Sequence, residues 1–216
     1  MVINGLIQYL VLIVLLTFHE FGHAWMAWKC GDDTARLQGR VSLNPLVHID
    51  PIGTVVVPLL GIFLSMTGSG LSQFLIGWAR PVPVNPYNLR NPRADDILVT
   101  LAGPWMNLLL AVVIMGLGRL CVMANSESMV GLCLMMARLS LFLCFFNLLP
   151  IPPLDGSQVV RSLIGMTFET YYQLARYGFI AIILVWQIPV VQQLIIGLTK
   201  GSLAVLANWF AVPLPF

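Results

Sequence analysis

The chain has 216 residues, of which 58% are hydrophobic and only 9% are charged, and its mean hydropathy is +0.88. A soluble domain carries charge on about a quarter of its residues, so this composition excludes an ordinary soluble protein and indicates a polytopic protein of the lipid bilayer. The net charge of +2 is too small, and its basic residues too scattered, to indicate a nucleic-acid partner.

Apolar stretches of about 20 residues, long enough to span a bilayer, predict transmembrane helices at Val2–Trp28, Ile97–Ala124, Val130–Leu149 and Tyr177–Leu198. The region Ile52–Trp78 is apolar but is interrupted at Gly61 and by Thr67–Gly70, which favours a re-entrant hairpin or two short helices. The tail Leu203–Val212 is too short to span and is expected at the interface or as a cap. We therefore expect an all-α bundle of about 4–6 transmembrane helices with a re-entrant or extended segment.

The basic residues orient these helices, because cytoplasmic connections collect positive charge. With the N-terminus outside, most basic residues fall in cytoplasmic connections: Lys29, Arg36, Arg40, Arg80, Arg90, Arg93, Arg161 and Arg176. Arg119 and Lys200 then lie outside, and Arg138 lies within a span. This orientation requires Ile52–Trp78 to start and end on the cytoplasmic side, as a hairpin does. The sequence shows no internal repeat, and we expect residues 1–216 to form a single integral-membrane domain.

Two histidines and a glutamate lie inside the first apolar stretch, in LLTFHEFGHAWMAW at residues 15–28. His19 and His23 are four residues apart, so a helix projects both from one face, where they can bind one zinc ion. In this HExxH pattern Glu20 is not a ligand; it takes a proton from water and delivers it to the leaving amine. Ionisable residues within a bilayer are costly, which disfavours a purely structural role for them.

A hydrolytic zinc site usually has three protein ligands and a fourth position for water. Asp155 is the leading third ligand, because NLLPIPPLDG contains prolines and a glycine that break a helix, and irregular backbone at membrane depth lines buried sites. The alternative role of Asp155 is to cap the next helix. His48, in LNPLVHIDP, is the competing ligand, with a role near the site or at the surface as its alternative. Cys144 is expected to pack in the core.

HEFGH, NPLVHIDPIGT, GWARPVPVNPYNLR, AGPWMN and NLLPIPPLDG follow one another in this order, separated by apolar spans. From about Leu15 to Val160 the chain resembles the site-2 proteases, intramembrane zinc metalloproteases, and especially their compact prokaryotic members without a PDZ domain. The resemblance implies one Zn²⁺ per chain held by His19, His23 and Asp155, with Glu20 as the catalytic base. It further implies transmembrane proteins or peptides as substrates, regulated intramembrane proteolysis, and an active site toward the cytoplasmic side of the cell membrane.

Other motifs of the resemblance predict supporting roles. Asn147 matches the family's asparagine before LDG, and its amide is expected to stabilise the oxyanion or hold the substrate; helix packing is the alternative. The segment Gly77–Asn85 alternates valine with proline, so it forms either an extended edge to which a substrate strand adds or an ordinary loop. Gly103 and Pro104 are expected to allow a close helix approach, with Asn107 bonding across it.

Two other functions compete with that of a protease. A metal-binding membrane carrier or transporter explains histidine and aspartate ligands, but it does not explain a glutamate placed for proton transfer. Such a carrier should also show further polar ligands on successive helical turns, or an inverted repeat, and the sequence shows neither. A catalytically silent relative that binds transmembrane helices is disfavoured, because every residue needed for hydrolysis is present.

Overall fold

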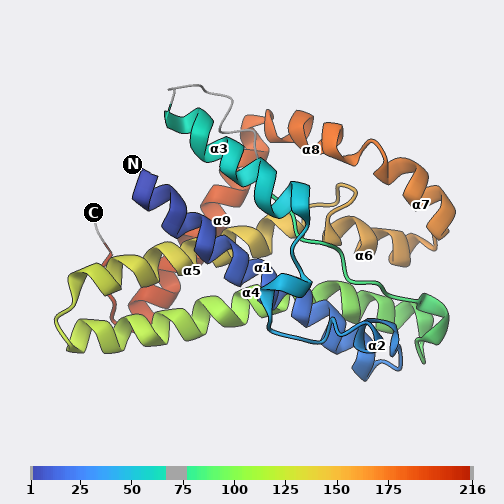
Figure 1. Ribbon diagram of the computed structural model, residues 1–216, viewed down its shortest axis with the longest axis horizontal. Coiled ribbons are helices and arrows are strands. Elements are labelled where there is room, and N and C mark those ends of the chain that lie inside the picture. The colour runs from blue at the N-terminus through green and yellow to red at the C-terminus, as the bar shows by residue number, and fades with distance from the viewer. Residues whose placement is uncertain (1, 67–76, 215–216) are drawn as a thin grey trace. The chain divides into compact units, whose positions relative to one another are not determined.

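The structure is a computed structural model that describes residues 2–66 and 77–214. Over these ranges the chain forms helices joined by turns and irregular segments, without a β-strand (Figure 1). Two compact units are distinguished, an N-terminal unit, Met1–Gly103, and a C-terminal unit, Pro104–Phe216, with one long helix running through the boundary. The expectation of an all-α polytopic membrane protein is confirmed.

The N-terminal unit starts with a long apolar helix. Its elements are α1 (Val2–Lys29), α2 (Thr34–Leu37), the 3-10 helix η1 (Pro45–Val47), the π-helical η2 (Pro51–Val56), α3 (Val57–Met66), the 3-10 helix η4 (Pro86–Asn88) and the first part of α4 (Pro92–Met123). After α1, Gly31 has a φ of +108°, a conformation that glycine adopts far more readily than other residues. This turn takes the chain away from the axis of α1.

The start and the end of the apolar region Ile52–Trp78 lie next to each other. Asp50 caps η2 by accepting the N–H of Gly53 at 2.6 Å. The chain comes back at Trp78, whose N–H donates to the Gly53 carbonyl at 3.1 Å and whose carbonyl accepts the Thr54 hydroxyl at 2.7 Å. The two ends are therefore adjacent, as the predicted hairpin requires. Thr67–Gly70 lies outside the described residues.

The predicted interruption at Gly61 is wrong, because α3 continues through this residue to Met66. A single glycine lowers helix stability by about 1 kcal/mol relative to alanine. That cost does not stop a helix whose other residues are apolar and which continues directly from η2.

The C-terminal unit contains the rest of α4, followed by α5 (Glu127–Asn147), α6 (Asp155–Ile164), α7 (Phe168–Ala175), α8 (Gly178–Trp186) and α9 (Pro189–Trp209). α5 packs along α9, and it is joined to α4 by the Ser140 hydroxyl, which donates to the Asn107 carbonyl at 2.7 Å. Both residues are 0% exposed. This bond uses the backbone carbonyl of Asn107 and joins α4 to α5, so it does not test the prediction that Asn107 bonds across the close approach at Gly103.

Helices that are long and apolar enough to cross a membrane are found, among the described residues, at 5–29, 92–123, 127–147 and 189–209. The first three confirm the predicted spans over these parts of the chain. Because several such helices occur in one apolar chain, the protein is an integral, multi-pass membrane protein.

The predicted span Tyr177–Leu198 is wrong, because the chain there forms two helices: α8 ends at Trp186 and α9 begins at Pro189. Proline lacks the N–H that would continue a helix, but its fixed φ suits the first turn of a new one. The Gln192 amide donates to the Trp186 carbonyl at 2.7 Å, so a carbonyl at the end of α8 is satisfied. α9 also takes in most of Leu203–Val212, which is therefore not a separate short tail.

Two of the basic residues assigned to connections are placed differently in the structure. Arg161 is only 4% exposed, and its guanidinium lies 3.7 Å from the centroid of the Phe168 ring. Lys200 lies within α9 and not in a connection after a span. A buried arginine does not act as a charge of an aqueous loop, so the orientation depends on the basic residues that flank α1 and α4.

Candidate metal centre

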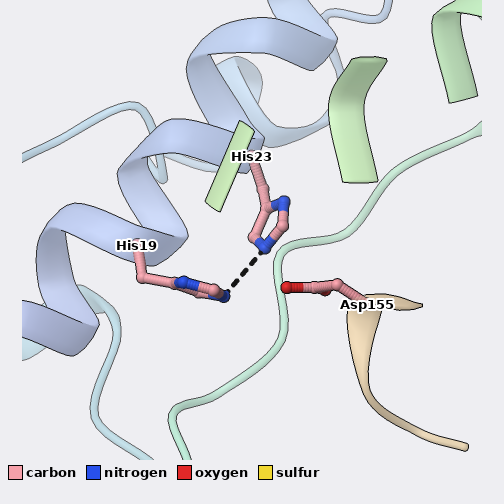
Figure 2. Close-up of side chains that lie close together, drawn as sticks. All are labelled: His19, His23 and Asp155. Carbon is pink, nitrogen blue, oxygen red and sulfur yellow. Dashed lines mark hydrogen bonds between the residues drawn. The ribbon is translucent and has the colours of Figure 1, made fainter. Parts of the chain in front are cut away.

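His19 and His23 form a close pair on one face of α1 (Figure 2). Their Nε2 atoms lie 3.1 Å apart, and their ring planes are inclined at 83°. In a tetrahedral zinc site with Zn–N distances of about 2.0–2.1 Å, two ligand nitrogens lie about 3.3 Å apart. The pair therefore fits two ligands of one zinc ion, and the two rings lie together as the spacing of four residues predicted.

A backbone carbonyl of α4 orients one ring of this pair. The Nδ1 atom of His23 lies 2.8 Å from the carbonyl oxygen of Val99. A carbonyl can only accept a hydrogen bond, so Nδ1 carries the proton and Nε2 keeps its lone pair for a metal. Histidine ligands of metals generally donate their second ring N–H in this way.

At Gly103, α4 lies directly against the histidine pair. A Cβ atom at this position would lie 2.3 Å from His23 Nε2 and 2.7 Å from His19 Cε1. No side chain fits there while the rings keep their places. The expected close helix approach at Gly103 is therefore confirmed, and Pro104 follows it inside α4.

Glu20 follows His19 on α1 and is half-buried. The Glu20 carboxylate lies near Arg40, which belongs to the connection after α1. Burial lowers the pKa of Arg40, and the negative charge of Glu20 opposes that shift. The structure thus places Glu20 on the helix that carries the histidine pair and near a buried guanidinium.

His48 is engaged elsewhere in the N-terminal unit. Its Nε2 donates to the Ser42 carbonyl at 2.8 Å, and the side chain is 2% exposed. Burial lowers the pKa of His48 and the nearby Arg40 charge lowers it further, while the Ser42 bond and the Glu20 charge oppose these effects. Within the described part of the chain, no group of three potential metal ligands includes His48.

Asp155 and its neighbours form a tight structure in the C-terminal unit. Asp155, drawn in Figure 2, is the first residue of α6 and is 7% exposed. Leu154 occupies the cap position, so the alternative of an N-cap at Asp155 is not observed. At Gly156 a Cβ atom would lie 2.1 Å from the Leu148 carbonyl oxygen. The glycine of the LDG motif thus lets residues 148–156 fold back on themselves. This places a carboxylate at the start of a new helix directly after α5.

Asn147 is the last residue of α5. One N–H of its side-chain amide donates to the Leu143 carbonyl, one turn earlier, at 2.9 Å. An amide has two N–H donors, so this bond fixes the orientation of the group and leaves its second donor for another partner.

Two groups at the site were not predicted from the sequence. The Val99 carbonyl belongs to the backbone, which has no residue signature. Arg40 was assigned only as a basic residue of a connection, although it is 4% exposed and held by several hydrogen bonds. The sequence signal for these surroundings was Gly103 in AGPWMN. A glycine indicates that another segment comes close, but it does not indicate which segment.

Comparison with known proteins agrees with this chemistry. A family model described as peptidase family M50 matches residues 7–126 and 121–186. “Putative zinc metalloprotease” is the description of two similar proteins, YwhC from Bacillus subtilis (strain 168) and Rip2 from Mycobacterium tuberculosis (strain ATCC 25618 / H37Rv). YwhC is 38% identical over 195 residues, which cover 86% of this chain and 83% of YwhC. Rip2 is 34% identical over 144 residues, which cover 67% of this chain and 52% of Rip2.

No solved structure was found to match the chain. The family match and the extent of the similarity to YwhC show that the chain belongs to peptidase family M50, the site-2 proteases. It is a zinc metalloprotease of the site-2 protease type, built into the membrane. A metal carrier and a catalytically silent relative are not favoured.

Proposed function

We propose that His19, His23 and Asp155 hold one zinc ion and that Glu20 is the base for hydrolysis of peptide bonds within or near transmembrane segments. The observation that carries this proposal is the pair of histidine Nε2 atoms, 3.1 Å apart and next to Glu20 on α1. Asp155 is supported by its buried position at the start of α6 and by the LDG motif. Two histidines and a carboxylate are a usual donor set for catalytic zinc.

The residues of the chain have separate tasks in this proposal. Zinc, when bound, supplies Lewis-acid activation of a water molecule and of the scissile carbonyl. Glu20 accepts the proton of that water and later passes it to the leaving amine. The Val99 carbonyl keeps His23 in the tautomer that a metal requires. The second N–H of the Asn147 amide donates to the oxygen on which negative charge develops.

The substrate that we propose is a transmembrane segment opened into an extended form. Peptide bonds within a helix are shielded by its own turns, so the chain must be held unwound for attack. The segment Gly77–Asn85 is itself irregular and extended, and its prolines keep it from forming a helix. A substrate backbone can add to such a segment as a strand. In this proposal both units serve one protease domain that covers residues 1–216.

We place the active site toward the cytoplasmic side of a prokaryotic cell membrane. This orientation is supported by exposed basic residues that flank α1 and α4, among them Arg36, Arg90 and Arg93. Single-cysteine labelling in intact cells tests it. A cysteine at Arg90 should react only after the membrane is permeabilised, and labelling at Arg90 from outside would contradict the orientation.

Glu20→Gln tests the proposed reaction directly, because glutamine keeps the size of the side chain but cannot accept the proton. Purified protein should retain about one zinc per chain, while cleavage of a transmembrane peptide should fall at least about 10²-fold, as expected for loss of a general base. Glu127→Gln is the matched control, since Glu127 is exposed at the start of α5. Near-normal cleavage by Glu20→Gln would refute the assignment.

A further inference from the structure

The extended segment Gly77–Asn85 is tied to the connection that precedes it in the sequence. The N–H of Arg80 donates to the His48 carbonyl at 2.9 Å, and the Thr54 hydroxyl donates to the Trp78 carbonyl at 2.7 Å. All these groups belong to the N-terminal unit. The segment is therefore ordered by hydrogen bonds although it has no regular secondary structure.

One buried side chain joins the two stretches of backbone. The guanidinium of Arg40 donates to the carbonyl of Val47 on one side, and to the carbonyls of Arg80 at 2.5 Å and Pro81 at 3.0 Å on the other. Arg40 is only 4% exposed. Burying a charge costs several kcal/mol unless hydrogen bonds compensate. A planar fork of donors can serve three carbonyls at once, whereas the ammonium of lysine is a compact point charge.

The Arg40 guanidinium lies within electrostatic range of Glu20. Burial lowers the pKa of Arg40, and the negative charge of Glu20 raises it by a smaller amount. The charge of Glu20 also raises the pKa of His48, which lies on the same connection. The hydrogen bonds of Arg40 therefore hold Gly77–Asn85 in the part of the unit that also contains Glu20.

We propose that Arg40 is a positioning residue of the protease, whose guanidinium fixes Gly77–Asn85 where the substrate backbone binds beside Glu20. This inference rests on the proposed function. Among the described residues, the N–H groups of Val82 and Val84 have no hydrogen-bond partner. These donors can bind a substrate chain only while the segment keeps its place, so Arg40 acts on substrate binding and not on the metal.

Arg40→Gln and Arg40→Lys test this inference, with Arg36→Gln as the matched control. Arg36 lies on the same connection, where it forms an exposed ion pair with Asp33 at 3.3 Å and lies 4.8 Å from the centroid of the Trp28 ring. Zinc content, KM and kcat are measured with a transmembrane peptide in detergent micelles. The same substitutions in a Glu20→Gln background allow the Kd of the uncleaved peptide to be measured by fluorescence anisotropy.

We expect Arg40→Gln to keep its zinc and to raise KM and Kd about tenfold, since hydrogen bonds to a charged group are lost. Its kcat should change little, Arg40→Lys should restore only part of the affinity, and Arg36→Gln should behave as the unmodified chain. Unchanged KM and Kd in Arg40→Gln, or full affinity in Arg40→Lys, would overturn the inference. A fall in kcat without a change in KM, or loss of zinc, would overturn it as well.

If Arg40→Gln does not fold, Thr54→Val replaces it, because this change removes another side-chain hydrogen bond to the segment. KM should rise in the same direction, and an unchanged KM would count against the inference. The two proposals fail in different ways. An unmodified chain that cleaves no peptide contradicts the proposed function, whereas a cleaving enzyme that is indifferent to Arg40 contradicts only its positioning role.

Discussion

The carbonyl oxygen of Val99 accepts a hydrogen bond from Nδ1 of His23 at 2.8 Å. These residues are 76 positions apart in the sequence and lie on α4 and α1. The bond fixes both the tautomer and the direction of the imidazole. The zinc affinity of the histidine pair should therefore depend on where α4 crosses α1. That crossing is permitted by the missing side chain of Gly103.

Gly103→Ala should therefore weaken zinc binding, although Gly103 offers no ligand atom. The added methyl group would lie 2.3 Å from His23 Nε2, so either the rings or α4 must move. We expect zinc affinity to fall about 10–100-fold, as is typical when the partners that orient a ligand are disturbed. Chelator competition measures it. Gly116→Ala is the control on the same helix, because its nearest neighbour is a Phe210 side-chain atom at 3.6 Å. Equal zinc affinity in both variants would contradict this role.

Asp155→Ala should lose most of its zinc, since one of the three proposed ligands is removed, whereas His48→Ala should keep about one ion per chain. The structure supports this contrast, because the group of potential metal ligands found among the described residues contains Asp155 and not His48. Metal analysis of the purified variants decides the matter, with Asp33→Ala as an exposed control. Stoichiometric zinc in Asp155→Ala together with its loss in His48→Ala would reverse the assignment.

Asn147→Ala should retain zinc and lose turnover. If the second N–H of the amide stabilises the developing oxyanion, its loss raises the activation barrier by about 2.7–4 kcal/mol, equivalent to about 10²–10³ in kcat. Asn208→Ala, near the exposed end of α9, is the control for removing an amide from a helix end. A lower melting temperature with normal turnover per folded molecule would show instead that the bond to Leu143 is the whole role of Asn147.

The ionisation of Asp32 should make the stability of the protein depend on pH. This carboxylate is 0% exposed and accepts hydrogen bonds from Thr34, Asn85 and Asn88. Burial raises its pKa, but these bonds outweigh burial and hold the pKa below its ordinary value. The folded state therefore binds this proton less readily than the unfolded chain. The resulting stability is present above about pH 4 and is lost as the pH falls through the folded pKa.

Asp32→Asn should lower the free energy of unfolding near neutral pH by about 1.5–3 kcal/mol, the usual contribution of hydrogen bonds to a charged group. It should also remove much of the loss of stability below about pH 4. Thermal unfolding of zinc-free protein measures both effects without interference from metal release. The control is Asp33→Asn, which changes an exposed carboxylate next in the chain. A variant that melts like Asp33→Asn at every pH would contradict the prediction.

The helices α1, α4 and α5 were predictable because each contains a predominantly apolar run of bilayer length. The break between α8 and α9 was not, because average hydropathy does not distinguish a proline inside a helix from one that begins the next helix. Pro104 lies inside α4, and Pro189 begins α9. Which outcome occurs depends on whether neighbouring groups satisfy the exposed carbonyls, as Gln192 does for Trp186.

The histidine pair was readable from sequence because a helix places residues four apart on one face. The surroundings of the pair were not readable, since they depend on contacts between distant segments. Arg40 looked like an ordinary basic residue of a connection, and only the fold shows it donating to carbonyls about forty residues further on. Charge alone cannot reveal that a cation is buried against backbone.

Gly156 has a consequence for genetics. Because the Leu148 carbonyl oxygen occupies the place of its side chain, every substitution there must displace the turn that leads to Asp155. In a saturation screen scored by cell phenotype, position 156 should tolerate replacement as poorly as a zinc ligand does, even though glycine has no side chain to coordinate a metal. Intolerance in such a screen therefore cannot by itself separate the residues that perform chemistry from the one that leaves space for them.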